Sequence, residues 1–207
     1  MPAPLFLKAL LGWYAGYSIV MAISPVDRDN WVLANILPFL LVATLIVTYR
    51  RWPLSRASYL LITVYLTLHT TGAHYTYAQM PLGQWIDDLW QLGRNHYDRV
   101  VHFSFGLLLT YPMEELFGML TAVRGGLLYY VPVMTILGLS GLWEIIEAWA
   151  AQTLQPELGL TFVGYQGDVW DAQQDMAAAL YGALLVTILL YAVRRWRAAS
   201  ASVHTEA

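Results

Sequence analysis

Cysteine is absent from the 207 residues of the chain. This excludes disulfide bridges, thiolate metal sites and cysteine nucleophiles, and it leaves histidine and carboxylate side chains as the available metal ligands. Charged residues make up only 12% of the sequence, and no run of Lys and Arg is long enough to follow a nucleic-acid backbone. A Gly-rich phosphate loop, a G-x-S-x-G elbow and an H-E-x-x-H signature are also missing. We therefore expect no nucleic-acid partner.

Apolar residues dominate what is present. They account for 58% of the chain, which includes nine Trp and fourteen Tyr, and this is too apolar for a soluble domain of its size. Six stretches come near the twenty or so residues that cross about 30 Å of hydrocarbon, so the sequence predicts an all-α polytopic membrane protein with six transmembrane helices. The predicted helices span about 5–23, 31–49, 57–75, 98–117, 127–150 and 174–193. They fill one integral-membrane domain, 1–207, in which 198–207 is expected to be a flexible tail.

The first stretch has a second interpretation, because an apolar N-terminal segment can be a cleaved signal peptide. Lys8 interrupts it, no small-x-small cleavage site precedes Ser24, and Trp13 suits a retained helix. We therefore predict that it remains as the first span. In the long third loop, Leu82–Trp90 has the pattern of a short helix that lies along the membrane surface.

Basic residues set the predicted orientation, because Lys and Arg beside helix ends stay on the cytoplasmic side. Eight of the eleven lie at the N-terminus, in the second and fourth loops and at the C-terminus, which places both termini in the cytoplasm. These eight are Lys8, Arg50, Arg51, Arg56, Arg124, Arg194, Arg195 and Arg197. Acidic residues hardly influence orientation, yet eleven of the fourteen fall on the outer side, against three basic residues, for a net charge of -8 there. The eleven are Asp27, Asp29, Asp87, Asp88, Asp98, Glu144, Glu147, Glu157, Asp168, Asp171 and Asp175.

Four of the predicted helices carry polar side chains at or just inside their outer ends. A charged side chain in hydrocarbon costs about 2.5–3.5 kcal/mol on insertion scales, so intramembrane acids normally have a partner, a water-filled cavity or a bound cation. Helical spacing places the members of each acid-containing group on one helix face. The groups are Asp98 with His102, Glu144 with Glu147, the stripe Asp168, Asp171 and Asp175, and His69 with His74.

Closely packed carboxylates repel one another unless some are protonated or a positive species sits between them. Acidic pairs on facing helices with a nearby His resemble the carboxylate metal sites of helical bundles. We therefore predict a bound divalent metal ion, and Zn, Mg, Mn and Fe all suit this oxygen-rich set. The predicted ligands are His102, Glu144, Asp171 and Asp175, and the predicted general base toward a metal-bound water is Asp168 or Glu147.

Arg94 and Arg99 are the basic residues nearest this layer. With Asn95 and Tyr97 they are predicted to hold an anionic headgroup or phosphate, because guanidinium groups bind such oxygens in pairs. The further candidate substrate contacts are Asp98, His69, His74 and Gln166.

Ordinary structural roles are the alternative for several of these residues taken singly. Asp98 could cap its helix or pair with Arg94 or Arg99, and the two arginines could pair with Asp98 or Asp87. Asp168 could cap its helix, and Glu147 could lie among hydrated lipid headgroups. His74 could bond to a backbone carbonyl. These roles do not account for the four predicted metal ligands together, because deep carboxylates without a deep Lys or Arg would leave the layer strongly negative.

Four polar, ordered strings carry a family resemblance. They are GAHYTYAQMPLG (72–83), RNHYDRVVHFSFGLLLTYP (94–112), WEIIEAW (143–149) and GYQGDVWDAQQDM (164–176). The chain from Asp27 to about Tyr181 closely resembles the YjdF-type bacterial inner-membrane proteins, a family of unknown function, which implies the same location. It also loosely resembles the VanZ-like membrane proteins, linked to glycopeptide-antibiotic tolerance at the cell envelope. The shared positions of that second pattern are Asp98, His102, Phe103, Glu144, Asp171 and Asp175.

The favoured functional hypothesis is therefore a bacterial inner-membrane protein whose outward-facing metal site acts on a lipid-linked or headgroup-sized envelope substrate, by metal-assisted hydrolysis. Membrane lipid is the expected partner. One alternative is a non-catalytic membrane protein that binds a cation or an envelope component. The other is a transporter or proton relay that uses the same acids, although the sequence lacks the pair of broken helices common in transporters.

Overall fold

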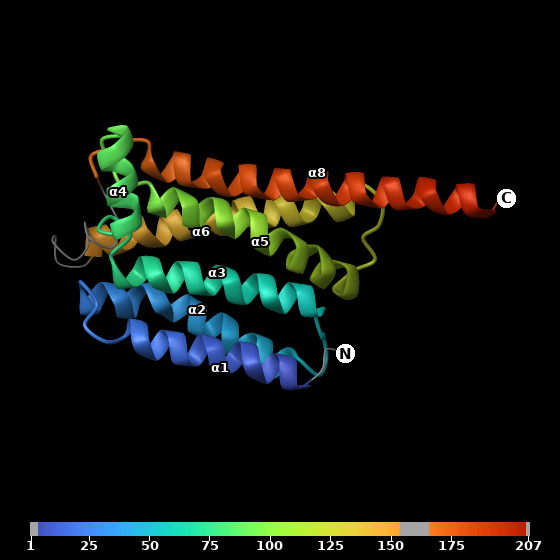
Figure 1. Cartoon of the computed structure of the whole chain (residues 1–207), viewed down its shortest axis with the longest axis horizontal. Coiled ribbons are helices and arrows are strands. Elements are labelled where there is room, and N and C mark those ends of the chain that lie inside the picture. Colours follow the sequence, from blue (N-terminus) through green and yellow to red (C-terminus); the bar gives the residue numbers. More distant parts are fainter. Residues whose placement is uncertain (1–3, 154–165, 206–207) are drawn as a thin grey trace.

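The computed structural model describes residues 4–153 and 166–205, and these residues are all-α (Figure 1). They form seven helices: α1 (Pro4–Met21), α2 (Arg28–Thr48), α3 (Arg56–His74), α4 (Pro81–Trp90), α5 (Tyr97–Leu120), α6 (Leu127–Thr153) and α8 (Asp171–Thr205). Each of the six predicted apolar stretches lies in one long helix, and the predicted surface segment is α4. The last helix runs past its predicted end at about 193 and includes most of 198–207. Glu157 and most of the predicted fifth loop lie outside the described residues.

Three of the described helices are long and apolar enough to cross a membrane: α2, α6 and the part of α8 from Asp171 to Ala201. The apolar part of α1, Leu5–Met21, is shorter. Helices α3 and α5 are of similar length, but they carry polar side chains that are buried inside the bundle, among them His69 and His102. The chain therefore has the composition of a helical membrane protein whose polar groups face inward.

Side-chain caps define where the first helices begin. The Asp27 carboxylate accepts the backbone N–H of Asn30 at 2.8 Å at the start of α2, and the Ser55 hydroxyl accepts that of Ser58 at 3.2 Å at the start of α3. Both satisfy N–H groups that have no partner within the helix. On α5, the Glu115 carboxylate accepts the backbone N–H of Ser55 at 2.8 Å, and so it ties the start of α3 to α5.

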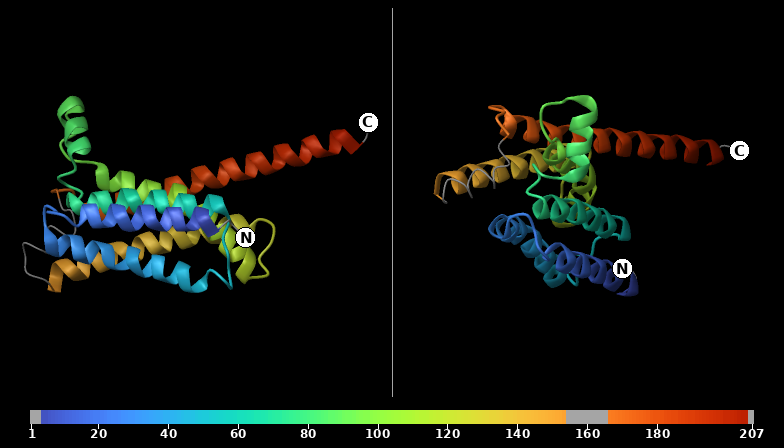
Figure 2. Two further views of the ribbon diagram at one scale, coloured as in Figure 1. Left: turned by 60° about the horizontal axis from the view of Figure 1, so that its bottom comes forward. Right: turned by 60° about the vertical axis from the view of Figure 1, so that its left-hand side comes forward.

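The helices are arranged around α3, which lies between the pair α1 and α2 and the group α5, α6 and α8 (Figures 1 and 2). One end of the bundle carries the C-terminal ends of α3 and α6 and the N-terminal ends of α5 and α8. Helix α4 lies at that end and runs across the direction of the long helices (Figure 1). Its exposed side chains include Trp85, Leu89 and Trp90, which suits a helix lying in a membrane interface.

Helices α5 and α8 approach each other most closely, because small residues line their contact. A Cβ added at Gly106 would lie 1.9 Å from the backbone oxygen of Ala179, and one at Gly182 would lie 2.2 Å from that of Phe103. Ala179 and Ala183 are fully buried in the same contact. Such small-residue contacts let helix backbones pack directly against each other, as membrane helices commonly do.

Candidate functional site

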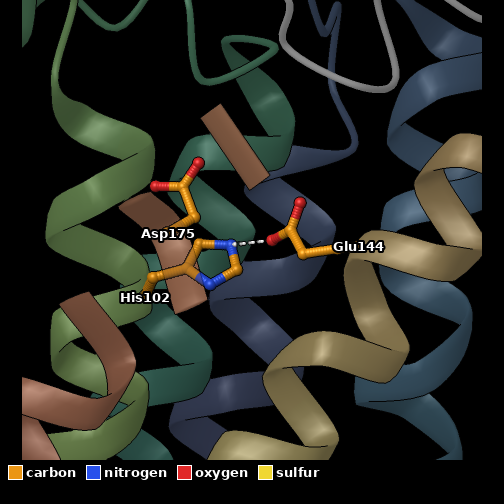
Figure 3. Close-up of side chains that lie close together, drawn as sticks. All are labelled: His102, Glu144 and Asp175. Carbon is orange, nitrogen blue, oxygen red and sulfur yellow. Dashed lines mark ion pairs between the residues drawn. The ribbon is translucent and has the colours of Figure 1, made fainter. Parts of the chain in front are cut away.

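Three side chains from three helices converge near the end of the bundle where α4 lies. They are His102 of α5, Glu144 of α6 and Asp175 of α8; His102 and Glu144 face each other, and Asp175 lies close to both (Figure 3). One possible ligand atom from each lies within 4.8 Å of the others. Within this group, the His102 Nε2 lies 3.5 Å from a carboxylate oxygen of Glu144.

The close contact of α5 with α8 brings two of these residues together. His102 lies four residues before Gly106, and Asp175 lies four residues before Ala179. The point where the two backbones touch is therefore about one helical turn, roughly 5–6 Å, from the His102 and Asp175 side chains. Because no side chain separates the helices there, the imidazole and the carboxylate reach the same space.

Ser140 orients the imidazole. Its hydroxyl lies 3.2 Å from the His102 Nδ1 and is buried, while the Nε2 faces carboxylates of Glu144 and, at 3.8 Å, Asp98. A histidine that ligates a metal through one nitrogen usually bonds through the other to a fixed neighbour, so Nε2 is the nitrogen available to a ligand. Sequence reasoning missed Ser140, although it lies four residues before Glu144 on the same face of α6.

Four carboxylates gather at this place, those of Asp98, Glu144, Glu147 and Asp175, and two of them lie within 4 Å of the His102 Nε2. Asp98, Glu147 and Asp175 are buried, and the Glu144 side chain is 10% exposed. Asp175 is only 2% exposed and Glu147 only 6%. Within the described part of the chain, one oxygen of Glu144 and one of Asp175 are buried without a hydrogen-bond partner. Buried polar atoms are nearly always satisfied, so these two oxygens lie where a proton or a cation is required.

Asp171 and Asp168 are not part of the three-residue group. The Arg94 guanidinium donates to the Asp171 carboxylate at 2.6 Å, and that of Arg99 donates to the Asp168 carboxylate at 2.5 Å. Longer contacts of 3.4 and 3.5 Å complete a network of two arginines and two aspartates. The arginines therefore neutralise the two aspartates nearest the start of α8, rather than Asp98 or Asp87. The Nε and the second terminal nitrogen of Arg94 are buried and unpaired among the described residues.

Two titratable groups beside this network have shifted pKa values. The backbone N–H of Trp170, followed by the Arg99 guanidinium, holds the pKa of Asp168 below its usual range. Partial burial, followed by the Arg99 and Arg94 charges, lowers the pKa of His96. Arg99 donates to the His96 Nδ1 at 3.2 Å, which requires that nitrogen to be an unprotonated acceptor. Asp168 is thus held ionised, and His96 is held neutral.

Asn95 and Gln166 join the loop before α5 to the loop before α8. The Asn95 backbone N–H donates to the Gln166 side-chain oxygen at 2.9 Å, and the Gln166 amide donates back to the Asn95 carbonyl at 3.0 Å. The Asn95 amide also donates to the carbonyls of Ala78 and Met80. The Tyr97 hydroxyl donates to the Leu68 carbonyl at 2.9 Å. These three predicted substrate contacts therefore connect loops and helices of the protein itself.

Both histidines of α3 bond to backbone carbonyls. The His69 Nε2 lies 2.9 Å from the Ala34 oxygen, and its Nδ1 lies 3.0 Å from the Tyr77 hydroxyl. The His74 Nδ1 lies 2.8 Å from the Met21 oxygen, which is the structural role that the sequence left open for it. His69 and His74 therefore connect α3 to α2, to Tyr77 and to the end of α1, and they lie outside the three-residue group.

One imidazole nitrogen and two carboxylates are a common donor set for divalent cations. Ligand atoms lie about 3.4 Å apart around a tetrahedral Zn ion, up to about 4.2 Å apart around Mg and up to about 5.2 Å apart around Ca. The ligand atoms of the present group lie within 4.8 Å of one another, so they would move closer together around a Zn or Mg ion. Oxygen-rich ligation with a single nitrogen is compatible with Mg, Mn, Fe and Zn.

Comparison with known proteins gives two matches. A family model described as "Predicted membrane protein (DUF2238)" matches residues 6–196. The chain is also 35% identical over 173 residues to the inner membrane protein YjdF of Escherichia coli (strain K12), and the match covers 83% of this chain and 82% of that protein. No solved structure matches the chain.

Proposed function

The chain belongs to the DUF2238 family of predicted membrane proteins, and from this premise we propose that it is a six-span inner-membrane protein that binds a divalent cation. In this proposal His102, Glu144 and Asp175 hold the ion, at an outward-facing site that acts on a lipid-linked or headgroup-sized envelope substrate. The relative from E. coli is an inner membrane protein, which supports the same location here.

The six spans are α1, α2, α3, α5, α6 and α8. Their similar direction in the bundle and the crosswise position of α4 support this arrangement (Figure 1). The proposed orientation, with both termini in the cytoplasm, follows from the eight basic residues at the opposite end from α4. Since the chain has no cysteine, single cysteines at Gln91 and Ser200 test it directly. A membrane-impermeant maleimide applied to intact cells should label the first and spare the second, and the reverse pattern would overturn the orientation.

The observation that carries the cation proposal is an excess of buried negative charge. After Arg94 and Arg99 are assigned to Asp171 and Asp168, four carboxylates remain around one imidazole, and no Lys or Arg among the described residues is paired with them. Such a group is unstable in a low-dielectric interior unless protons or a cation compensate it. The unpaired oxygens of Glu144 and Asp175 point to compensation at the centre of the three-residue group.

Metal analysis of the purified protein tests the proposal. We expect about one equivalent of a divalent metal per chain, or stoichiometric binding of added Mn²⁺ or Zn²⁺, that is lost in His102→Ala and Asp175→Asn. The matched controls are His74→Gln, which removes an imidazole bonded to a backbone carbonyl, and Asp88→Asn, which removes an exposed carboxylate of α4. Absence of metal from the wild type, with no binding of either added ion, would refute the cation site and favour shared protons.

Hydrolysis is the reaction proposed for this site, where His102, Glu144 and Asp175 would hold the cation and the cation would activate a water molecule. Because Asp168 forms an ion pair with Arg99, Glu147 is the favoured general base. Glu147 is buried and lies three residues after Glu144. The free donors of Arg94 remain the proposed contact for an anionic headgroup. Glu147→Gln should keep the metal but abolish turnover of an envelope-lipid extract. If no turnover is found with the wild type while the metal is present, a binding protein without catalysis is favoured.

A further inference from the structure

A cavity of about 260 Å³ lies between α2, α3, α5 and α6. Most of its wall consists of aliphatic and aromatic side chains, and its few polar wall residues include Asp98, His102 and Ser140. The His102 side chain therefore belongs both to the cavity wall and to the three-residue group with Glu144 and Asp175. A molecule in the cavity would contact the imidazole from the apolar side.

The cavity reaches the outer surface of the bundle between α2 and α6. Three of its wall residues are also exposed: Leu37 of α2 is 45% exposed, and Leu139 and Leu142 of α6 are 41% and 48% exposed. Both helices are apolar and long enough to cross a membrane. Helix α2 packs on α3, whereas α6 packs on α5 and α8, so the two sides of this opening belong to different parts of the bundle.

We infer that the cavity admits a hydrocarbon tail of a membrane lipid through the opening between α2 and α6, and so places the polar end of that lipid beside His102. The occupant is a hydrocarbon chain because the wall and the rim are apolar and the rim faces the lipid phase. A polar ligand would leave its hydrogen-bonding groups unpaired in this mostly apolar cavity, whereas a hydrocarbon chain has no such groups to satisfy. The binding of the tail does not need the cation, but its role as a substrate rests on the proposed function.

The size of the cavity limits how much of a tail it can hold. A dry apolar cavity of about 150 Å³ binds benzene, with six carbons, so a cavity of 260 Å³ would hold a segment of about ten carbon atoms. A whole two-chain lipid does not fit. The remaining part of the chain and any second tail would stay in the surrounding bilayer, next to Leu37 and Leu142.

Photolabelling in vesicles tests this inference. The wild-type protein is reconstituted in phosphatidylethanolamine and phosphatidylglycerol with a trace of one of two probes: phosphatidylglycerol with a diazirine in its acyl chain, or a diazirine-bearing prenyl phosphate. We expect labelling of Val101 and Leu109, which line the cavity and are otherwise buried. Comparison of the two probes distinguishes an acyl chain from an isoprenoid chain.

Paired substitutions at the rim separate cavity binding from general lipid contact. Leu142→Trp, at the opening, should reduce the labelling of Val101 and Leu109 several-fold. Ile145→Trp should not, because Ile145 is 47% exposed on the same helix but does not line the cavity. Leu37→Trp provides a second rim variant if Leu142→Trp does not fold.

The result also distinguishes this inference from the cation site. Labelling that persists in EDTA and in Asp175→Asn supports tail binding even if no metal is found. Stoichiometric metal with no labelling of Val101 or Leu109 by either probe would overturn the inference and leave the cation site intact. Equal labelling in Leu142→Trp, Leu37→Trp and the wild type would overturn it as well.

Discussion

Replacing Gly106 with alanine adds one methyl group at the closest approach of α5 and α8. The new Cβ would lie 1.9 Å from the Ala179 carbonyl oxygen, whereas non-bonded heavy atoms prefer about 3.5 Å. The two helices must therefore separate locally by about 1.5 Å. The clash is with backbone, so no change of side-chain rotamer on α8 relieves it.

The expected effect on stability is modest, but the effect on the site is large. Overpacking of this kind costs about 1–3 kcal/mol, and the better helix propensity of alanine returns about 1 kcal/mol. The net loss is then at most about 2 kcal/mol. Metal ligation tolerates deviations of only about 0.2 Å, and His102 and Asp175 lie one turn from the clash. We therefore expect cation affinity to fall by about 10- to 100-fold, which is the usual loss when a residue that positions a metal ligand is removed.

The assay combines Mn²⁺ titration with thermal unfolding in detergent, followed by the fluorescence of the nine Trp residues. Gly138→Ala is the matched control, because a Cβ at Gly138 meets nothing within 4 Å. It should keep the affinity and gain slightly in stability. Gly141→Ala is an intermediate case, because its Cβ would lie 3.2 Å from the mobile end of Met176, and it should change the affinity little.

Wild-type affinity in a folded Gly106→Ala protein would refute this reasoning. It would mean that the spacing of α5 and α8 does not set the distance between His102 and Asp175. Equal loss of affinity in Gly138→Ala would also contradict it, since that change has no steric cause.

Three further predictions follow from the neighbouring contacts. Ser140→Ala removes the partner of the His102 Nδ1 and should weaken Mn²⁺ binding about 10- to 100-fold in titrations without unfolding the protein. Arg94→Met leaves the buried Asp171 carboxylate with only the 3.5 Å contact to Arg99 and should destabilise by up to about 3 kcal/mol; adding Asp171→Asn should restore part of this loss in thermal unfolding, and strict additivity would exclude a direct pair. Folding lowers the pKa of His96. The contribution of His96 to folding stability is therefore fully present at a pH above the unfolded-state pKa of about 6.5, and it declines as the pH falls below that pKa. His96→Gln should flatten this decline when melting temperatures at pH 7.5 and 5.5 are compared, and an unchanged slope would assign the decline to other groups.

Sequence reasoning predicted the helices because the relevant signal is local. Each apolar stretch is long enough to form a helix by itself, and Leu82–Trp90 is amphipathic over a few turns, so its helix α4 was predicted within one residue. The depth of a residue along its helix also follows from the rise of about 1.5 Å per residue. For this reason His102, Glu144 and Asp175 were predicted at similar depths, and they do lie together.

Depth does not determine which groups face each other across helices. Asp171 and Asp175 are four residues apart on one face of α8, and the sequence predicted both as metal ligands. In the fold, the Arg94 side chain reaches Asp171 from the loop before α5, while Asp175 lies beside His102. A pairing between residues more than seventy positions apart depends on the rotation and separation of two helices, which no local pattern encodes.

The sequence by itself determined that this chain has long apolar helices and that several of them carry acids and histidines near one end, because hydrophobicity and helical periodicity act over neighbouring residues. Only the tertiary structure decided that two arginines neutralise Asp168 and Asp171, that Ser140 orients His102, and that Gly106 lets α5 touch α8. These contacts arise from backbone separations of a few ångströms between segments distant in the chain. The same separations determine which carboxylates remain uncompensated around the imidazole.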